Sequence, residues 1–122
     1  MSQIIVCDTC GWGEGEKIRD GRAGGEVFAE LIESAARQAQ GVTVRRVSCL
    51  MGCEHPCNAA IQASGKMNYV LGRFKPSQEG AQALVDYAVG HARSPAGVVP
   101  YKQWPQGVKG HFIARIPPPE ED

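Results

Sequence analysis

Two short β-branched runs, each followed by cysteines, constrain the fold of this chain most. The first is Gln3–Cys7 and the second is Val42–Val47, which leads to Cys49. Between them, apolar residues recur at helical spacing over residues 27–39, and Gly41 is expected to end the helix. A strand, a crossover helix and a second strand form a βαβ unit, whose two strands run parallel. Both cysteine groups are therefore expected to meet at one edge of an α/β sheet.

The remaining segments predict how this unit is completed. Residues 11–25 contain six glycines in fifteen positions and are expected to form a loop. Residues 58–63 and 66–74 predict an antiparallel β-hairpin with a tight glycine turn, and residues 79–93 predict a second helix. The expected order is thus strand, helix, strand, hairpin and C-terminal helix.

The C-terminal quarter differs in composition from the rest of the chain. Residues 1–93 are expected to form the domain proper, and residues 94–122, with six prolines in 29 positions, an extended proline-rich arm. The acidic end of this arm is expected to be frayed. Four apolar residues are expected to pack it onto the domain: Tyr101, Trp104, Phe112 and Ile113.

Length, charge and cysteine count exclude several classes of protein. The 122 residues suffice for one modest core, and 13 basic residues balance 13 acidic ones. This balance argues against nucleic acid or an anionic membrane as the main partner. Neither a membrane-length apolar run nor a signal peptide is evident, so we expect a cytoplasmic protein. Clustered cysteines in a reducing compartment bind metal or perform redox chemistry more often than they form disulfides.

The cysteines fall into two groups that could supply a shared metal centre. The first group is Cys7 and Cys10. The second group, after 38 intervening residues, is Cys49, Cys53 and Cys57. Four thiolates suit a [2Fe–2S] cluster, two for each iron, and they also suit a single zinc ion. Glycines beside the cysteines favour the bulkier cluster, because they let backbone N–H groups approach its sulfurs: Gly11, Gly13 and Gly52.

Two other functions and one purely structural interpretation use the same cysteines. A metal-binding or delivery protein would hold zinc or another soft ion in the same sulfurs. A thiol–disulfide oxidoreductase would use Cys7 and Cys10, but it leaves the other three cysteines unexplained. Buried core thiols are the structural interpretation, although confinement to two loops is untypical of core residues.

The segment Cys49-Leu-Met-Gly-Cys53, which follows a strand and precedes a hairpin, resembles the second cysteine pair of the thioredoxin-like [2Fe–2S] ferredoxins. That family includes a subunit of respiratory NADH dehydrogenases, and the element order agrees over residues 3–93. The resemblance implies a thioredoxin-like ferredoxin fold, a [2Fe–2S] cluster, one-electron transfer between redox partner proteins and frequent homodimers. It assigns four ligands: Cys7, Cys10, Cys49 and Cys53. Such a protein is an electron carrier and not an enzyme by itself.

Two features depart from that family. The Cys7–Cys10 spacing is tighter than the four or more intervening residues usual there, and Cys57 has no counterpart. Cys57 could replace Cys53 or Cys10 as a ligand, exchange with a ligand as a spare thiol, or pack under the loop. The chain is also similar, including its arm, to a bacterial family of small predicted metal-binding proteins. Some of these are associated with corrinoid (cobalamin) synthesis, which suggests an enzyme of that pathway as an electron acceptor.

Four further residues near the cysteines have both a functional and an ordinary interpretation. His55 could ligate a metal or couple proton to electron transfer, but a polar loop residue is the more common case. Trp12 could shield a cluster from water or pack on the first helix. Arg45 and Arg46 could attract an acidic redox partner, although charges on the solvent side of a strand are ordinary. His91 and His111 receive no role.

Overall fold

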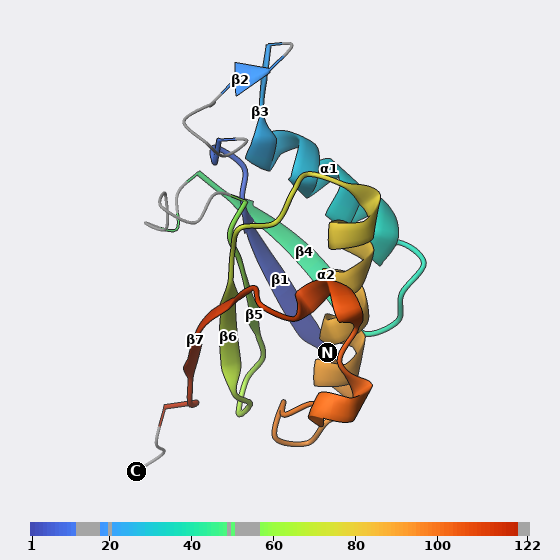
Figure 1. The fold of residues 1–122 in the computed structure, drawn as a ribbon. Helices are drawn as coiled ribbons and strands as arrows, with labels where there is room; N and C mark the ends of the chain where they lie inside the picture. The colour runs from blue at the N-terminus through green and yellow to red at the C-terminus, as the bar shows by residue number, and fades with distance from the viewer. Residues whose placement is uncertain (12–17, 20, 49, 51–56, 120–122) are drawn as a thin grey trace.

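A five-stranded mixed sheet with two helices forms the centre of the protein (Figure 1). This is a computed structural model, and it describes residues 1–11, 18–19, 21–48, 50 and 57–119. The strands follow the spatial order β4-β1-β5-β6-β7, and β2 and β3 form a separate two-stranded ribbon. The elements are β1 (Ser2–Cys7), β2 (Ile18–Arg19), β3 (Arg22–Ala23), α1 (Gly24–Ala36), β4 (Val42–Val47), β5 (Ala59–Gln62), β6 (Asn68–Leu71), α2 (Gln78–Arg93) and β7 (Phe112–Ile116).

The expected βαβ unit is confirmed. Strands β1 and β4 pair in parallel, in a register that runs from Ser2 opposite Val42 to Cys7 opposite Val47. Because parallel strands end at the same edge of a sheet, the segments that follow Cys7 and Val47 start side by side. The predicted hairpin is also confirmed, as β5 pairs antiparallel with both β1 and β6.

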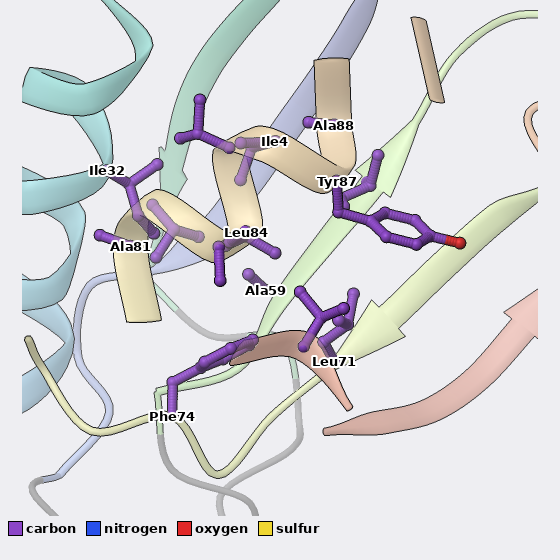
Figure 2. Close-up of a cluster of buried hydrophobic side chains, with 14 of the residues drawn as sticks. Ile4, Ile32, Ala59, Leu71, Phe74, Ala81, Leu84, Tyr87 and Ala88 are labelled. Carbon is purple, nitrogen blue, oxygen red and sulfur yellow. The ribbon is translucent and has the colours of Figure 1, made fainter. Parts of the chain in front are cut away.

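Both helices cover the same face of the sheet. Helices α1 and α2 pack against each other and each also packs against β1, which places them in one layer (Figure 1). Side chains alternate across the strands, so Ile4 and Ile61 point into the helix layer and are fully buried. Figure 2 shows Ile4 and Leu71 of the sheet close to Leu84 and Tyr87 of α2.

Helix α1 begins and ends earlier than the sequence predicted. It starts at Gly24 and stops at Ala36, so the expected end near Gly41 is wrong. Residues 37–40 form turns, and Gly41 then adopts a φ of +80° before β4. Helix α2 agrees with its prediction, and its first turn is capped by the Ser77 side chain, which accepts a hydrogen bond from the backbone of Gly80.

The glycine-rich segment is not a loop throughout. Strands β2 and β3 form a short antiparallel ribbon in which Ile18 pairs with Ala23 and Arg19 with Arg22. Gly21 lies in its turn with a φ of +76°, a conformation that glycine adopts without strain. The prediction of a continuous loop over residues 11–25 is therefore wrong for this part. The rest of that prediction, residues 12–17 and 20, lies outside the described residues.

The segment after α2 supplies a fifth strand, which the sequence did not predict. Strand β7 pairs antiparallel with β6, and Trp104 packs between Tyr87 and Phe112 while its indole N–H donates to the carbonyl of Val99 at 2.8 Å. Trp104 and Phe112 thus anchor the segment as expected. Tyr101 and Ile113 are 62% and 42% exposed, and Tyr101 stacks on Trp104 of the same segment, so these two residues do not anchor it to the core as expected. No helix among the described residues is long and apolar enough to cross a membrane.

His91, to which the sequence gave no role, ties three elements together at the end of the sheet remote from Cys7. Its ring is fully buried in the last turn of α2. The ring Nε2 lies 2.6 Å from the carbonyl of Met67, so Nε2 carries the hydrogen, and Nδ1 accepts from the hydroxyl of Ser2 at 2.5 Å. Burial lowers the pKa of His91, and the positive charges of Lys66 and the N-terminal amine lower it further.

Acid should therefore destabilise the protein through His91. The unfolded chain binds a proton at an ordinary histidine pKa of about 6.5, whereas the folded chain keeps His91 neutral to lower pH. The free energy of unfolding should fall as the pH drops below about 6.5, by up to about 1.4 kcal/mol per pH unit. Urea unfolding of wild type and His91→Gln at pH 7.5 and 5.0 measures this. The variant should lose part of the pH dependence. Equal slopes in wild type and His91→Gln would contradict the assignment.

Candidate functional site

The thiol edge is the end of the sheet where β1 and β4 both terminate. Asp8, directly after β1, donates its backbone N–H to the carbonyl of Val47 at 3.0 Å. The hydroxyl of Thr9 donates to the carbonyl of Ser48. The two cysteine-bearing segments are thus joined by hydrogen bonds where they leave the sheet, as the parallel pairing predicted. Cys49 and Cys53 lie outside the described residues, so their predicted ligand roles stay predictions.

Three buried thiols lie at this edge. Cys7 and Cys10 are 3% and 5% exposed, and Cys57 is fully buried. The thiol of Cys57 donates toward the carbonyl of Gly11 at 3.6 Å, which connects the end of the second cysteine segment to the first. Cys57 adopts a φ of +57°, which is uncommon for a residue with a side chain. Residues from both cysteine groups therefore lie side by side.

Hydrogen-bond donors from both segments converge on the Cys7 sulfur. Burial raises the pKa of the Cys7 thiol, but hydrogen bonds from the thiol of Cys10 and from the backbone of Thr9 lower it. The backbone of Leu50, in the second segment, lowers it further. The net effect is a pKa below the ordinary thiol value, so Cys7 ionises most readily among the three thiols that the structure describes.

Burial dominates at the other two thiols. It raises the pKa of Cys10 to about 11, even though the backbone N–H groups of Asn58 and Cys57 donate to its sulfur. Burial likewise raises the pKa of Cys57 to about 12, and the charges of Cys10 and Cys7 add to this effect. Within the pair, Cys7 is therefore the more acidic thiol and Cys10 the less acidic one, and Cys57 is a neutral neighbour.

The first turn of α1 packs directly on the Cys7–Cys10 segment. The backbone N–H of Gly25 donates to the carbonyl of Cys10 at 2.8 Å. A β-carbon at Gly25 would lie 2.2 Å from the carbonyl oxygen of Cys7 and 2.9 Å from the backbone nitrogen of Cys10. Only glycine fits so close an approach. The helix N-terminus also contributes a positive partial charge near the thiolate.

The described donors suit a metal–thiolate centre chemically, but they complete only part of one. Within the ranges that the structure describes, no group of three or more His, Cys, Asp or Glu side chains is arranged to hold a metal ion. The hydrogen-bonded pair Cys7–Cys10 supplies the two thiolates that one iron of a [2Fe–2S] cluster needs. The N–H groups directed at both sulfurs are typical of sites that bind thiolate metals.

The other predicted site residues have mixed outcomes. His55 and Trp12 lie outside the described residues. Arg46 is exposed, as expected, but its side chain turns toward α1, where its Nε donates to a Glu33 carboxylate oxygen at 3.0 Å. Arg45 is exposed, as expected.

His111, to which the sequence assigned no role, contacts residues of two other segments near the thiol edge. Its ring stacks on Phe74, with centroids 4.4 Å apart, and its Nδ1 bonds the carbonyl of Gly72 at 2.9 Å. Phe74 in turn stacks on Phe28 of α1. Its neighbours all come from distant parts of the chain, so no local sequence signal identified it.

The family described as "Protein of unknown function (DUF1636)" matches residues 4–118 of the chain. The match includes the sheet, both helices and β7. No curated protein and no solved structure matches the chain.

The three described thiols should differ in reactivity in the metal-free, reduced protein. Because its pKa is lowered, Cys7 should be alkylated by iodoacetamide faster than Cys10 or Cys57 at pH 7.5. Mass spectrometry of peptides after timed alkylation measures this order. Preferential labelling of Cys57 would contradict the assigned hydrogen bonds.

Substitution of Gly25 should loosen the thiol edge. Gly25→Ala forces a methyl group against the Cys7 carbonyl and should lower the free energy of unfolding by about 3 kcal/mol. Gly90→Ala in α2 is the matched control, because its added methyl group meets only the Val99 side chain, which can move. Chemical denaturation of the two variants measures the difference, and equal stabilities would refute the close approach at Gly25.

Proposed function

We propose that the chain, which belongs to the DUF1636 family, is a small electron-transfer protein that binds a [2Fe–2S] cluster through cysteine thiolates. The observation that carries this proposal is the thiol pair at the end of β1. Cys7 and Cys10 are buried, hydrogen-bonded to each other and approached by backbone N–H groups from both cysteine segments. Such donors stabilise negative charge on sulfur and help to set the potential of an iron–sulfur centre.

The topology supports the finer assignment to the thioredoxin-like ferredoxins. Strand β1 pairs in parallel with β4 across the crossover helix α1, and then antiparallel with β5 of the hairpin that precedes α2. This is the order of elements that the resemblance implies. Strand β7 is an addition at the far edge of the sheet and leaves the thiol edge unchanged. We therefore propose a thioredoxin-like core extended by one strand.

Cys7, Cys10, Cys49 and Cys53 are the proposed ligands. Cys7 and Cys10 would hold one iron, and the second segment, which starts beside them, would supply the other two thiolates. Cys57 belongs to the buried hydrophobic cluster and donates to the carbonyl of Gly11. It is fully buried among these apolar side chains, so we assign it a packing role under the loop.

The residues around the pair perform three tasks in electron transfer. The cluster, when bound, accepts and releases one electron. The backbone N–H groups of Thr9, Leu50 and Asn58 hold negative charge on sulfur in both oxidation states without moving. Burial of both thiols excludes water, and the docking of Gly25 fixes the first segment on helix α1. The rest of the domain serves as a rigid support.

A thiol–disulfide oxidoreductase is the second candidate, because the pair is asymmetric. Cys7 has a lowered pKa and Cys10 one of about 11, as in a nucleophile with a resolving thiol. Against it, both sulfurs are almost fully buried, whereas an attacking thiolate must reach the disulfide of its substrate. A third candidate is a metal-binding or delivery protein, which would hold zinc or another soft ion in the same four sulfurs.

The spectrum of protein purified without oxygen separates these functions. A [2Fe–2S] protein should be red-brown, with iron and acid-labile sulfide in equal amounts, about two of each per chain. A colourless protein that contains zinc would support metal binding or delivery instead. A colourless, metal-free protein that reduces insulin disulfides would support the oxidoreductase. Either of these last two results would refute the electron-transfer proposal.

Single substitutions should identify the ligands. Cys7→Ser, Cys10→Ser, Cys49→Ser and Cys53→Ser should each lose most of the visible absorbance, because serine ligates iron poorly. Cys57→Ser is the matched control from the same loop and should retain the cluster, at some cost in stability, since it places a hydroxyl in a buried site. If Cys57→Ser bleaches the protein and Cys53→Ser does not, the ligand assignment is wrong although the function stands.

A further inference from the structure

The sheet face opposite the helices carries a continuous row of residues from five strands. We call this row the open face. Each residue in it is paired across strands with the next, in a fixed register. It consists of Arg45, Ile5, Ala60, Val70 and Ala114.

Burial distinguishes the open face from the helix-covered face. Ala60 and Val70 are half-buried and Ala114 is exposed, whereas Ala59 and Leu71, their neighbours along the strands, are fully buried under the helices. Ile116, on the neighbouring row of the same face by strand alternation, is also exposed. Small and β-branched apolar side chains thus form a partly accessible band over β5, β6 and β7, while Ile5 of β1 is 9% exposed.

The open face leads directly to the thiol edge. Side chains of a strand alternate, so Ile5 and Cys7 of β1 lie on the same side of the sheet, two residues apart. A protein that lies on the open face therefore comes close to the first cysteine of the pair. The outer faces of the helices offer no such approach, because α1 and α2 lie on the opposite side of the sheet.

Charge is separated between the two sides of the domain. The five strands of the sheet contain no aspartate or glutamate, and Arg45 is the strand arginine that the register places on the open face, whereas α1 and α2 contain five acidic residues. Arg46, on the helix side, is neutralised by Glu33. Arg45, on the open face, has no ion pair with any residue that the structure describes. Arg73 and Lys75, which follow β6 toward the thiol edge, are exposed and add to this positive charge.

We propose that the open face is the docking surface for an acidic redox protein, whose contact area has a small apolar centre bordered by carboxylates. This inference rests on the proposed electron-transfer function and names the class of partner. Complementary charge steers such encounters, and a weak, apolar-centred contact suits a transient exchange. A second copy fits less well, because the strands of its own open face carry no carboxylate to pair with Arg45.

The test uses flavodoxin, a small acidic FMN protein, as the probe. It is added to ¹⁵N-labelled protein at low ionic strength, and backbone amide shifts are followed. Shifts should concentrate at Ile5, Arg45, Ala60 and Val70, be absent from the outer faces of α1 and α2, and vanish in high salt. Arg45→Gln should weaken the dissociation constant about threefold, the scale of one exposed charge. Arg46→Gln is the matched control, since Arg46 faces the helices and already has a partner, and it should bind as wild type does.

Several results would overturn the proposal. They are an absence of shifts, shifts on the helix faces, or equal weakening by Arg45→Gln and Arg46→Gln. Shifts of open-face amides on dilution without flavodoxin would assign the surface to a second copy. Shifts on deletion of residues 120–122 would assign it to the acidic C-terminal tail. Binding at the open face does not require a metal centre. A colourless protein that still binds flavodoxin would therefore refute the cluster alone. A red-brown protein that does not bind flavodoxin would refute the docking surface alone.

Discussion

The parallel pairing of β1 with β4 is the contact on which the thiol edge depends. The register places Cys7 opposite Val47, and two further hydrogen bonds, from Asp8 and Thr9, extend it into the cysteine segments. Side chains almost forty residues apart in sequence thereby share one environment. A shift of one residue in this register would move every side chain of β1 to the other face and separate the two groups. The chemistry proposed here thus follows from the geometry of the sheet.

At the thiol edge, burial and hydrogen bonding oppose each other, and the balance differs between neighbours. Burial disfavours a thiolate at all three cysteines. Donors from Thr9, Leu50 and Cys10 overcome it only at Cys7, while Cys10 and Cys57 keep raised pKa values. A bound cation would reverse this effect for its ligands, because opposite charge stabilises the thiolate. The metal-free pair therefore has the properties of a reactive dithiol, and a bound cation would make both cysteines thiolate ligands.

The C-terminal segment also supports the thiol edge, through ring contacts that reach helix α1. A stack of three rings leads from Phe28 in α1 through Phe74 to His111, with centroid separations of 5.3 Å and 4.4 Å. His111 also bonds Gly72, just after β6, and lies directly before β7. The fifth strand thus connects the helix that supports the Cys7–Cys10 segment to the far edge of the sheet. Aromatic contacts of this kind contribute about 0.5–1.5 kcal/mol each beyond the area that they bury.

The sequence by itself determined the βαβ unit, the hairpin, the second helix and the expectation that two cysteine groups share an edge, because periodicity and turn chemistry are local signals. The start of α1 and strand β7 were decided by tertiary contacts: Gly25 against the Cys7 carbonyl and β7 against β6. The tertiary structure alone decided which buried groups are neutral, since His91, Cys10 and Cys57 take their protonation states from neighbours distant in sequence. Local patterns record which face of an element is apolar, but only the folded chain brings together the donors and charges that set a pKa.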